Sequence, residues 1–213
     1  MNRNRYSINR YKLILNLTFV APIIISFLAA YSNKHTNLYY YTIPFLVVLN
    51  EVIFLKEEDL LHNKEVKDKG ILSAIIIAFF YSYSLYMASK HNLSSSELLT
   101  SMLLILIGAF LRSASKIFLG RYFSNSIRIE NNHKIIKDKI FKYIRHPAYT
   151  GTLLIILGFS LMMDINISIY IFFLCFLMTM RRIDIEEHML IKKFGNEYIS
   201  YMHKTWKLFP FII

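Results

Sequence analysis

The chain has 213 residues, of which 55% are hydrophobic and 15% aromatic, and its formal net charge is +11. A mean hydropathy of +0.39 is too high for an ordinary soluble domain and indicates a membrane protein. The basic residues gather between apolar runs without a nucleic-acid-binding motif, so the charge favours a membrane protein over a nucleic-acid-binding one. The single cysteine excludes an intramolecular disulfide.

Apolar runs predict that the first half of the chain crosses the membrane several times. Three runs are long enough for the hydrocarbon core, and a fourth continues amphipathically through residues 117–119. The predicted spans are residues 13–31, 38–55 and 71–89, and a fourth that opens with residues 98–111.

The second half begins with a long basic loop, residues 112–146, which is followed by shorter apolar runs. These runs, residues 150–163 and 165–180, each cover only about 21–24 Å at about 1.5 Å per residue. They predict a tight helical hairpin with Asp164 and Asn166 at its tip.

Together these segments predict an all-α transmembrane bundle with five to six membrane segments, ending in a polar, amphipathic tail at residues 181–213. Lysine and arginine are frequent in the N-terminus, residues 56–70, the long basic loop and the tail, and they are rare in the intervening loops. Both termini are therefore expected in the cytoplasm. The frequent use of Asn, Ile and Lys suggests an AT-rich genome, and hence a bacterial cell membrane.

The stretch Arg145–Gly151 lies where the basic loop meets the hairpin. Pro147 suits the first turn of a helix, where a missing N–H costs nothing. Arg145 and His146 would then lie at the membrane surface, and Gly151 would let another group approach the backbone closely. The simplest interpretation is a basic interface anchor followed by a helix start. The hairpin, however, places this stretch beside a second polar cluster, residues 181–187.

In that cluster, Arg182 and Glu186 are four residues apart and share a helix face, with Glu187 on a neighbouring face. Such a pair is usually a surface salt bridge, but ionisable groups near the headgroup level often mark function. Glu186 could accept hydrogen bonds from a ligand amine or ribose hydroxyls. Arg182 could hold a carboxylate or phosphate with its planar fork. The scattered histidines predict no metal site.

An ordered series of residues resembles the isoprenylcysteine carboxyl methyltransferase family of integral membrane enzymes and the related phospholipid methyltransferases. The resemblance covers residues 110–213, while residues 1–109 match only as membrane spans. The residues that carry it are Phe110-Leu111-Arg112, Leu119–Ser124, His133, Tyr143–Gly151, Arg182, Glu186-Glu187, Leu190, Phe194–Tyr198, Tyr201 and Pro210-Phe211.

The resemblance implies one membrane domain in which residues 1–109 are transmembrane helices and residues 110–213 bind S-adenosylmethionine. The cofactor would lie in a cytoplasmic pocket built by the loop, the hairpin and the tail. Arg182 would face the substrate and act in catalysis with Glu187, while Arg128 is a further cofactor candidate. The expected cofactor-binding residues are His133, Lys134, Ile135, Ile136, Phe141, Arg145, His146, Pro147, Ala148, Tyr149, Gly151 and Glu186.

One segment departs from the family. The usual Gly-Pro-Tyr is replaced by Lys139-Ile140-Phe141, which keeps an aromatic ring but loses its hydroxyl. The change affects the local turn and one polar contact to the cofactor.

The family's chemistry suits a lipid-like or prenylated small-molecule acceptor that enters from the bilayer. A sulfonium methyl is already activated, so a carboxylate acceptor needs alignment and removal of water rather than a metal or a strong base. An amine acceptor would need a base, for which Glu187 and His146 are candidates. Neither a nucleic acid nor a protein partner is expected.

Other classes remain open. A sterol-type reductase would use NADPH with a similar C-terminal half, but such enzymes tend to have Asp, Arg and Cys where this chain has Glu186-Glu187-His188. A phospholipid-amine N-methyltransferase and a non-catalytic relative are further alternatives. Binding of S-adenosylmethionine or NADPH would discriminate among them.

Overall fold

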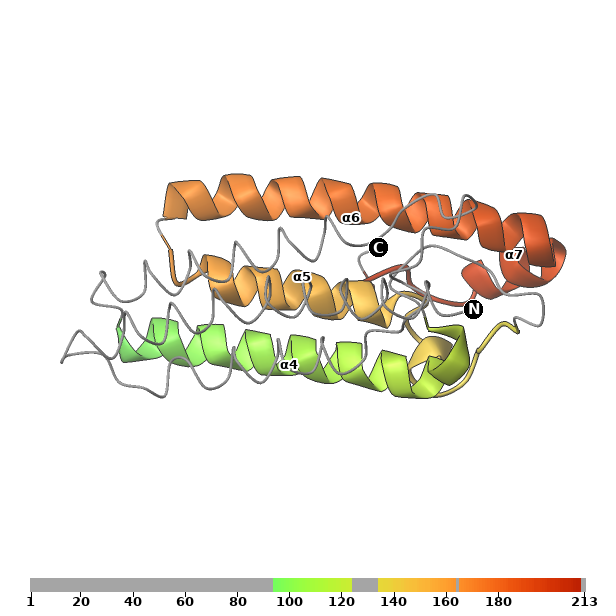
Figure 1. Ribbon diagram of the computed structural model, residues 1–213, viewed down its shortest axis with the longest axis horizontal. Coiled ribbons are helices and arrows are strands. Elements are labelled where there is room, and N and C mark those ends of the chain that lie inside the picture. The colour runs from blue at the N-terminus through green and yellow to red at the C-terminus, as the bar shows by residue number, and fades with distance from the viewer. Residues whose placement is uncertain (1–93, 124–133, 164, 212–213) are drawn as a thin grey trace, which may run out of the picture.

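The computed structural model describes residues 94–123, 134–163 and 165–211, and these residues are mainly helical. In Figure 1 the axes of α4 (Ser95–Leu119), α5 (Pro147–Ser160) and α6 (Ile165–Phe194) are aligned, with α5 between the other two and α7 (Asn196–Met202) at one end. No β-strand occurs in these ranges, so the all-α prediction is confirmed for them. The three spans predicted before residue 94 lie outside the described residues.

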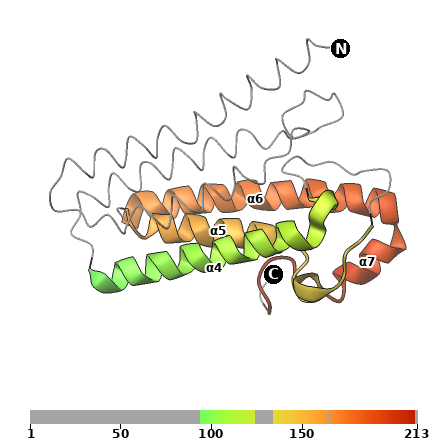
Figure 2. The same ribbon diagram turned by 60° about the horizontal axis from the view of Figure 1, so that its bottom comes forward.

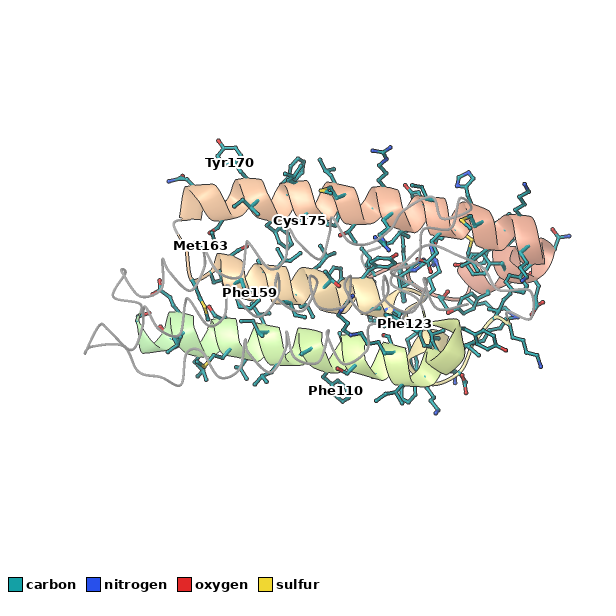
Figure 3. The ribbon with its side chains drawn as sticks, viewed as in Figure 1. Phe110, Phe123, Phe159, Met163, Tyr170 and Cys175 are labelled. Carbon is teal, nitrogen blue, oxygen red and sulfur yellow. The ribbon has the colours of Figure 1, made fainter. Side chains whose placement is uncertain are left out.

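Helix α4 starts with a capping box that places its first turn before the predicted residue 98. The Ser94 side chain accepts a hydrogen bond from the Glu97 N–H, and the Glu97 carboxylate accepts one from the Ser94 N–H at 2.9 Å. In the part of the chain described, the segment Ser96–Leu119 is the one helix long and apolar enough to cross a membrane. Only 28% of the apolar stretch of this helix is buried, so most of its apolar side chains face away from the rest of the protein. Figure 3 shows Phe110 pointing away from the other helices.

The fourth predicted span continues through residue 119, as predicted, so the first residues of the predicted basic loop, 112–119, belong to α4. Arg112 lies within the helix, and its guanidinium Nη1 donates to Thr152 Oγ1 of α5 at 2.8 Å. The helix ends at Gly120, whose φ of 51° suits a residue without Cβ. The charge of Arg112 therefore marked a contact between helices and not the end of one.

Helix α5 begins at Pro147, as predicted, and its 14 residues span about 21 Å. Helix α6 begins at residue 165, as predicted, but it continues to Phe194 instead of ending near residue 180. The first part of the predicted polar, amphipathic tail, residues 181–194, is therefore helical, which agrees with the prediction that Arg182 and Glu186 share a helix face. Its residues there are mostly good helix formers, and no glycine or proline interrupts them before Gly195, whose φ is 55°.

Three glycines let α4 and α5 approach each other closely. A Cβ at Gly108 would lie 2.5 Å from the Gly151 carbonyl oxygen, and one at Gly151 would meet the Gly108 carbonyl oxygen. A Cβ at Gly158 would lie 2.8 Å from the Ser101 carbonyl oxygen. Gly151 and Gly158 are seven residues apart and share a helix face, so the contact runs along α5.

Replacing Gly151 with alanine is expected to destabilise the protein by about 3 kcal/mol, because backbone atoms of α4 cannot move aside as a side chain can. Gly120→Ala is the matched control. Its Cβ would meet nothing within 4 Å, so only its positive φ resists, at a cost of roughly 1 kcal/mol. Thermal unfolding in detergent measures both variants. Equal losses would show that backbone freedom, and not helix contact, explains Gly151.

The last residues of the chain form a strap, residues 203–211, that turns back from α7 towards the start of α5 (Figure 2). The Arg145 N–H donates to the Trp206 carbonyl at 2.9 Å, and Thr150 Oγ1 donates to the Leu208 carbonyl at 2.8 Å. The Leu208 side chain is fully buried against Leu153 of α5 and Ile183 of α6. The strap is therefore part of the core that joins α5 to α6.

Candidate functional site

Polar side chains gather where the first turn of α5 meets the part of α6 beyond its apolar stretch. They form a cluster centred on Tyr149 and another centred on Glu187. The residues come from the loop before α5, from both helices and from the strap. The sequence prediction that Arg145–Gly151 lies beside residues 182–187 is confirmed by these contacts.

In the first cluster, the Tyr149 hydroxyl joins Arg182 to Glu186. It donates to Glu186 Oε2 at 2.8 Å and accepts from Arg182 Nε at 3.0 Å. The Arg182 guanidinium carbon also lies 6.0 Å from the centre of the Tyr149 ring. All three side chains are half-buried. Arg182 and Glu186 share a face, as predicted, but the simple salt bridge between them is replaced by a bridge through the tyrosine.

The second cluster surrounds Glu187, which is only 5% exposed. Its Oε1 lies 2.7 Å from Arg145 Nε and 3.1 Å from His146 Nε2, and its Oε2 lies 3.5 Å from Lys207 Nζ. Arg145 also donates to the carbonyl oxygens of Met202 and Thr205. Glu187 therefore ties α6 to the loop before α5 and to the strap.

The environment of Glu187 keeps its carboxylate ionised. Burial alone would raise the pKa of Glu187, but hydrogen bonds and positive charge from His146 and Arg145 outweigh burial and lower the pKa to about 2. A carboxylate held in this way is a poor proton acceptor at neutral pH. The structure thus does not support the predicted catalytic role of Glu187.

Arg145 and His146, predicted to lie at the membrane surface, are enclosed by protein. Their side chains are only 9% and 4% exposed, because both turn inward to the Glu187 carboxylate. These residues are enclosed by protein on several sides. Besides any contact with the membrane surface, these side chains hold the Glu187 carboxylate within the protein.

Acid should open this cluster. The folded pKa of Glu187 is lowered from 4.5 to about 2, so the cluster stabilises the protein above pH 4.5 and loses that contribution as pH falls towards 2. We expect the melting temperature in detergent to fall across this range. Glu187→Gln should lack this part of the fall, whereas Asp184→Asn, at an exposed carboxylate, should keep it. An unchanged acid profile in Glu187→Gln would contradict the assignment.

Several of the predicted cofactor-binding residues serve the fold. Phe141 is 4% exposed, Pro147 is fully buried, and Gly151 packs against α4. Gly151 is therefore not part of the proposed pocket. The segment Lys139-Ile140-Phe141, which departs from the family's usual residues, lies in a 3₁₀ turn (Lys139–Lys142), and the Tyr201 hydroxyl donates to the Phe141 carbonyl at 2.7 Å. The altered sequence thus keeps an ordered turn.

The remaining predicted residues are more open. Tyr149 and Glu186 are half-buried at the centre of the first cluster. Arg128 and His133 lie outside the described residues. Lys134 is exposed, and the others, which are half-buried, are Ile135, Ile136 and Ala148.

Sequence reasoning missed the contribution of the strap. Lys207 reaches both Asp184 and Glu187, and its backbone carbonyl accepts from the His146 N–H at 3.2 Å. Lys207 lies in an otherwise aromatic and apolar segment, and no local pattern marks it as a partner of α6. The described residues contain no group of three or more His, Cys, Asp or Glu side chains that could hold a metal ion.

Comparison with known proteins shows a consistent family likeness. Residues 100–192 match the model of the isoprenylcysteine carboxyl methyltransferase (ICMT) family. Protein-S-isoprenylcysteine O-methyltransferase B of Arabidopsis thaliana is 32% identical over 112 residues, covering 51% of this chain and 57% of the relative. The Saccharomyces cerevisiae protein-S-isoprenylcysteine O-methyltransferase is 28% identical over 201 residues, covering 87% of this chain and 79% of the relative.

The fold is also similar to a solved structure of the eukaryotic intramembrane Ras methyltransferase ICMT. The TM-score is 0.51 at 18% identity, with 95% of this chain and 98% of the other covered. This likeness concerns the fold alone. The relatives named here are eukaryotic, so they lend no support to the expected bacterial membrane.

Proposed function

Because residues 100–192 match the model of the isoprenylcysteine carboxyl methyltransferase family, we propose that this chain is an integral membrane methyltransferase that uses S-adenosylmethionine. Its acceptor is the carboxylate of a prenylated or other lipid-like molecule. The observation that carries the proposal is the Tyr149 hydroxyl standing between Arg182 and Glu186. The Arg182 guanidinium and the Glu186 carboxylate thus lie on either side of one hydroxyl.

Glu186 suits the cofactor. Its Oε2 is held by Tyr149, and its Oε1 has no hydrogen-bond partner among the described residues. A half-buried carboxylate of this kind accepts hydrogen bonds from an ammonium group or ribose hydroxyls and favours a nearby cation. When bound, S-adenosylmethionine supplies an activated sulfonium methyl group. Ala148, Ile135 and Ile136 would line the pocket beside Glu186, with Lys134 as a further contact.

Arg182 suits the acceptor. Its Nε is engaged by the Tyr149 hydroxyl at 3.0 Å, which fixes the plane of the guanidinium group. The fork binds a carboxylate by charge-assisted hydrogen bonds and orients it for in-line attack. Tyr149 is thus a positioning residue for both Arg182 and Glu186.

The second cluster favours a carboxylate acceptor over an amine. Methylation of an amine requires removal of a proton, whereas a carboxylate is already deprotonated. Glu187 has a pKa of about 2, and His146 Nε2 is bound to Glu187 in a buried position. Neither predicted base is placed to take a proton from an acceptor. We therefore favour O-methylation over phospholipid-amine N-methylation.

The wider organisation follows as part of the same proposal. The chain forms a single membrane domain in which residues 1–109 shape the acceptor's entrance and residues 110–213 bind the cofactor. The site and both termini face the cytoplasm. A lipid-tailed acceptor reaches Arg182 from the bilayer, and no nucleic acid or protein partner is required.

Binding and transfer assays on the protein in lipid nanodiscs test the proposal. We expect binding of S-adenosylmethionine but not NADPH, and transfer of labelled methyl to a prenylated cysteine with a free carboxylate. The same prenylated cysteine as a carboxamide is the matched control and should receive no label. NADPH binding alone would indicate a reductase, label on phospholipid amines an N-methyltransferase, and binding of neither a non-catalytic relative.

A further inference from the structure

Three large aromatic side chains lie exposed beside the site and have no role in the proposed reaction. We call Tyr143, Trp206 and Phe211 the aromatic patch, and they are 62%, 41% and 87% exposed. The rings of Trp206 and Phe211 have centroids 5.6 Å apart. The Trp206 N–H donates to the Tyr143 carbonyl at 2.9 Å, so the loop and the strap hold the patch together.

The patch lies next to the apolar start of α5. Arg145, two residues after Tyr143, is two residues before Pro147, the first residue of α5. On the strap, Leu208 lies two residues beyond Trp206 and packs against Leu153, one turn and a half into α5. The strap therefore runs from the polar end of the molecule alongside the apolar helix α5. The aromatic patch lies at the boundary between the polar end and the apolar part of this helix.

The charges around the patch are positive. Lys142 and Lys204 are exposed, and Lys142 Nζ lies 5.8 Å from the centre of the Tyr143 ring. Tryptophan and tyrosine beside lysines, at the end of apolar helices, match the composition of the membrane–water interface. In that position the rings replace costly contact with water, and the ammonium groups reach lipid phosphates.

We propose that the aromatic patch is a contact surface for the phospholipid headgroup region of the leaflet that the site faces. Trp206 and Phe211 lie at the level of the glycerol and upper acyl chains, and Lys142 and Lys204 lie against the phosphates. The Trp206 backbone is bonded to Tyr143 and Arg145, so this contact also fixes the depth of the Arg145–Glu187 pair. The inference concerns the position of the fold in the membrane and does not depend on the proposed methyl transfer.

The chain contains a single tryptophan, so its fluorescence reports on the patch directly. The protein is placed in nanodiscs of phosphatidylcholine and phosphatidylglycerol whose acyl chains are brominated either near the glycerol or near the methyl end. We expect bromine near the glycerol to remove more than about half of the Trp206 emission, with less quenching from deep bromine or aqueous iodide. Strong iodide quenching without lipid quenching would overturn the proposal, as would protection from all quenchers.

Reference variants calibrate how quenching depends on depth. They are made in a Trp206→Phe background, so that each protein again contains one tryptophan. The Phe173 side chain is 60% exposed in the apolar part of α6, so Phe173→Trp should be quenched best by bromine near the methyl end. Lys192→Trp, at the exposed polar end of α6, should respond to iodide alone. Phe211→Trp in the same background tests the patch without touching the Trp206 backbone contacts. It should repeat the shallow pattern of Trp206, and an iodide-only response there would also overturn the proposal.

Discussion

Replacing Glu186 with alanine is expected to weaken S-adenosylmethionine binding by roughly 100-fold or more, because about two charge-assisted hydrogen bonds of 1.5–3 kcal/mol each are lost. The Glu186 carboxylate offers a polarised Oε2, held by Tyr149, and an Oε1 without a partner in the described part of the chain. Calorimetric titration of the detergent-purified protein measures the effect directly.

The control for Glu186 is Asp184→Ala, which removes an exposed carboxylate from the same helix. Its surface ion pair with Lys207 contributes little, so cofactor binding should change less than about threefold. Tyr149→Phe keeps the Glu186 charge and removes only its hydrogen bond, which should give an intermediate loss. Unchanged binding in Glu186→Ala, with a normal melting temperature, would remove Glu186 from the cofactor site.

Replacing Arg182 with alanine is expected to lower kcat/KM for the acceptor by about 100–1,000-fold while S-adenosylmethionine binding stays within about threefold. Tyr149 holds the guanidinium group beside the Glu186 carboxylate, where we propose that it binds the acceptor. Initial rates with the prenylated carboxylate acceptor, at saturating cofactor, measure the loss.

Two variants separate the role of Arg182 from a general effect of charge. Arg182→Lys keeps the positive charge but not the planar fork, so it should recover only part of the activity. Arg181→Ala removes the neighbouring exposed arginine and should be nearly neutral. Turnover in Arg182→Ala equal to that of Arg181→Ala would contradict a substrate role. A matching loss of cofactor affinity would instead place Arg182 on the cofactor side.

The sequence determines the local features of the site. Pro147 sets the start of α5, because its fixed φ and missing N–H suit that position alone. The spacing of Arg182 and Glu186 places both on one face of α6. The length of α6 is also encoded, since no helix breaker occurs before Gly195. The apolar run ends near residue 180 and the helix continues, because polarity marks the environment of a helix and not its end.

The tertiary structure decided which partners Glu186 and Glu187 contact. Glu186 and Glu187 are adjacent and chemically identical, and one residue turns a helix by about 100°. That rotation directs Glu186 to Tyr149, and Glu187 to Arg145, His146 and Lys207, which lie about 20 to 42 residues away in the chain. No local rule specifies such partners, because they depend on how α5, α6 and the strap pack together. For the same reason, the sequence showed that Gly151 permits a close approach, but only the fold showed that α4 makes it.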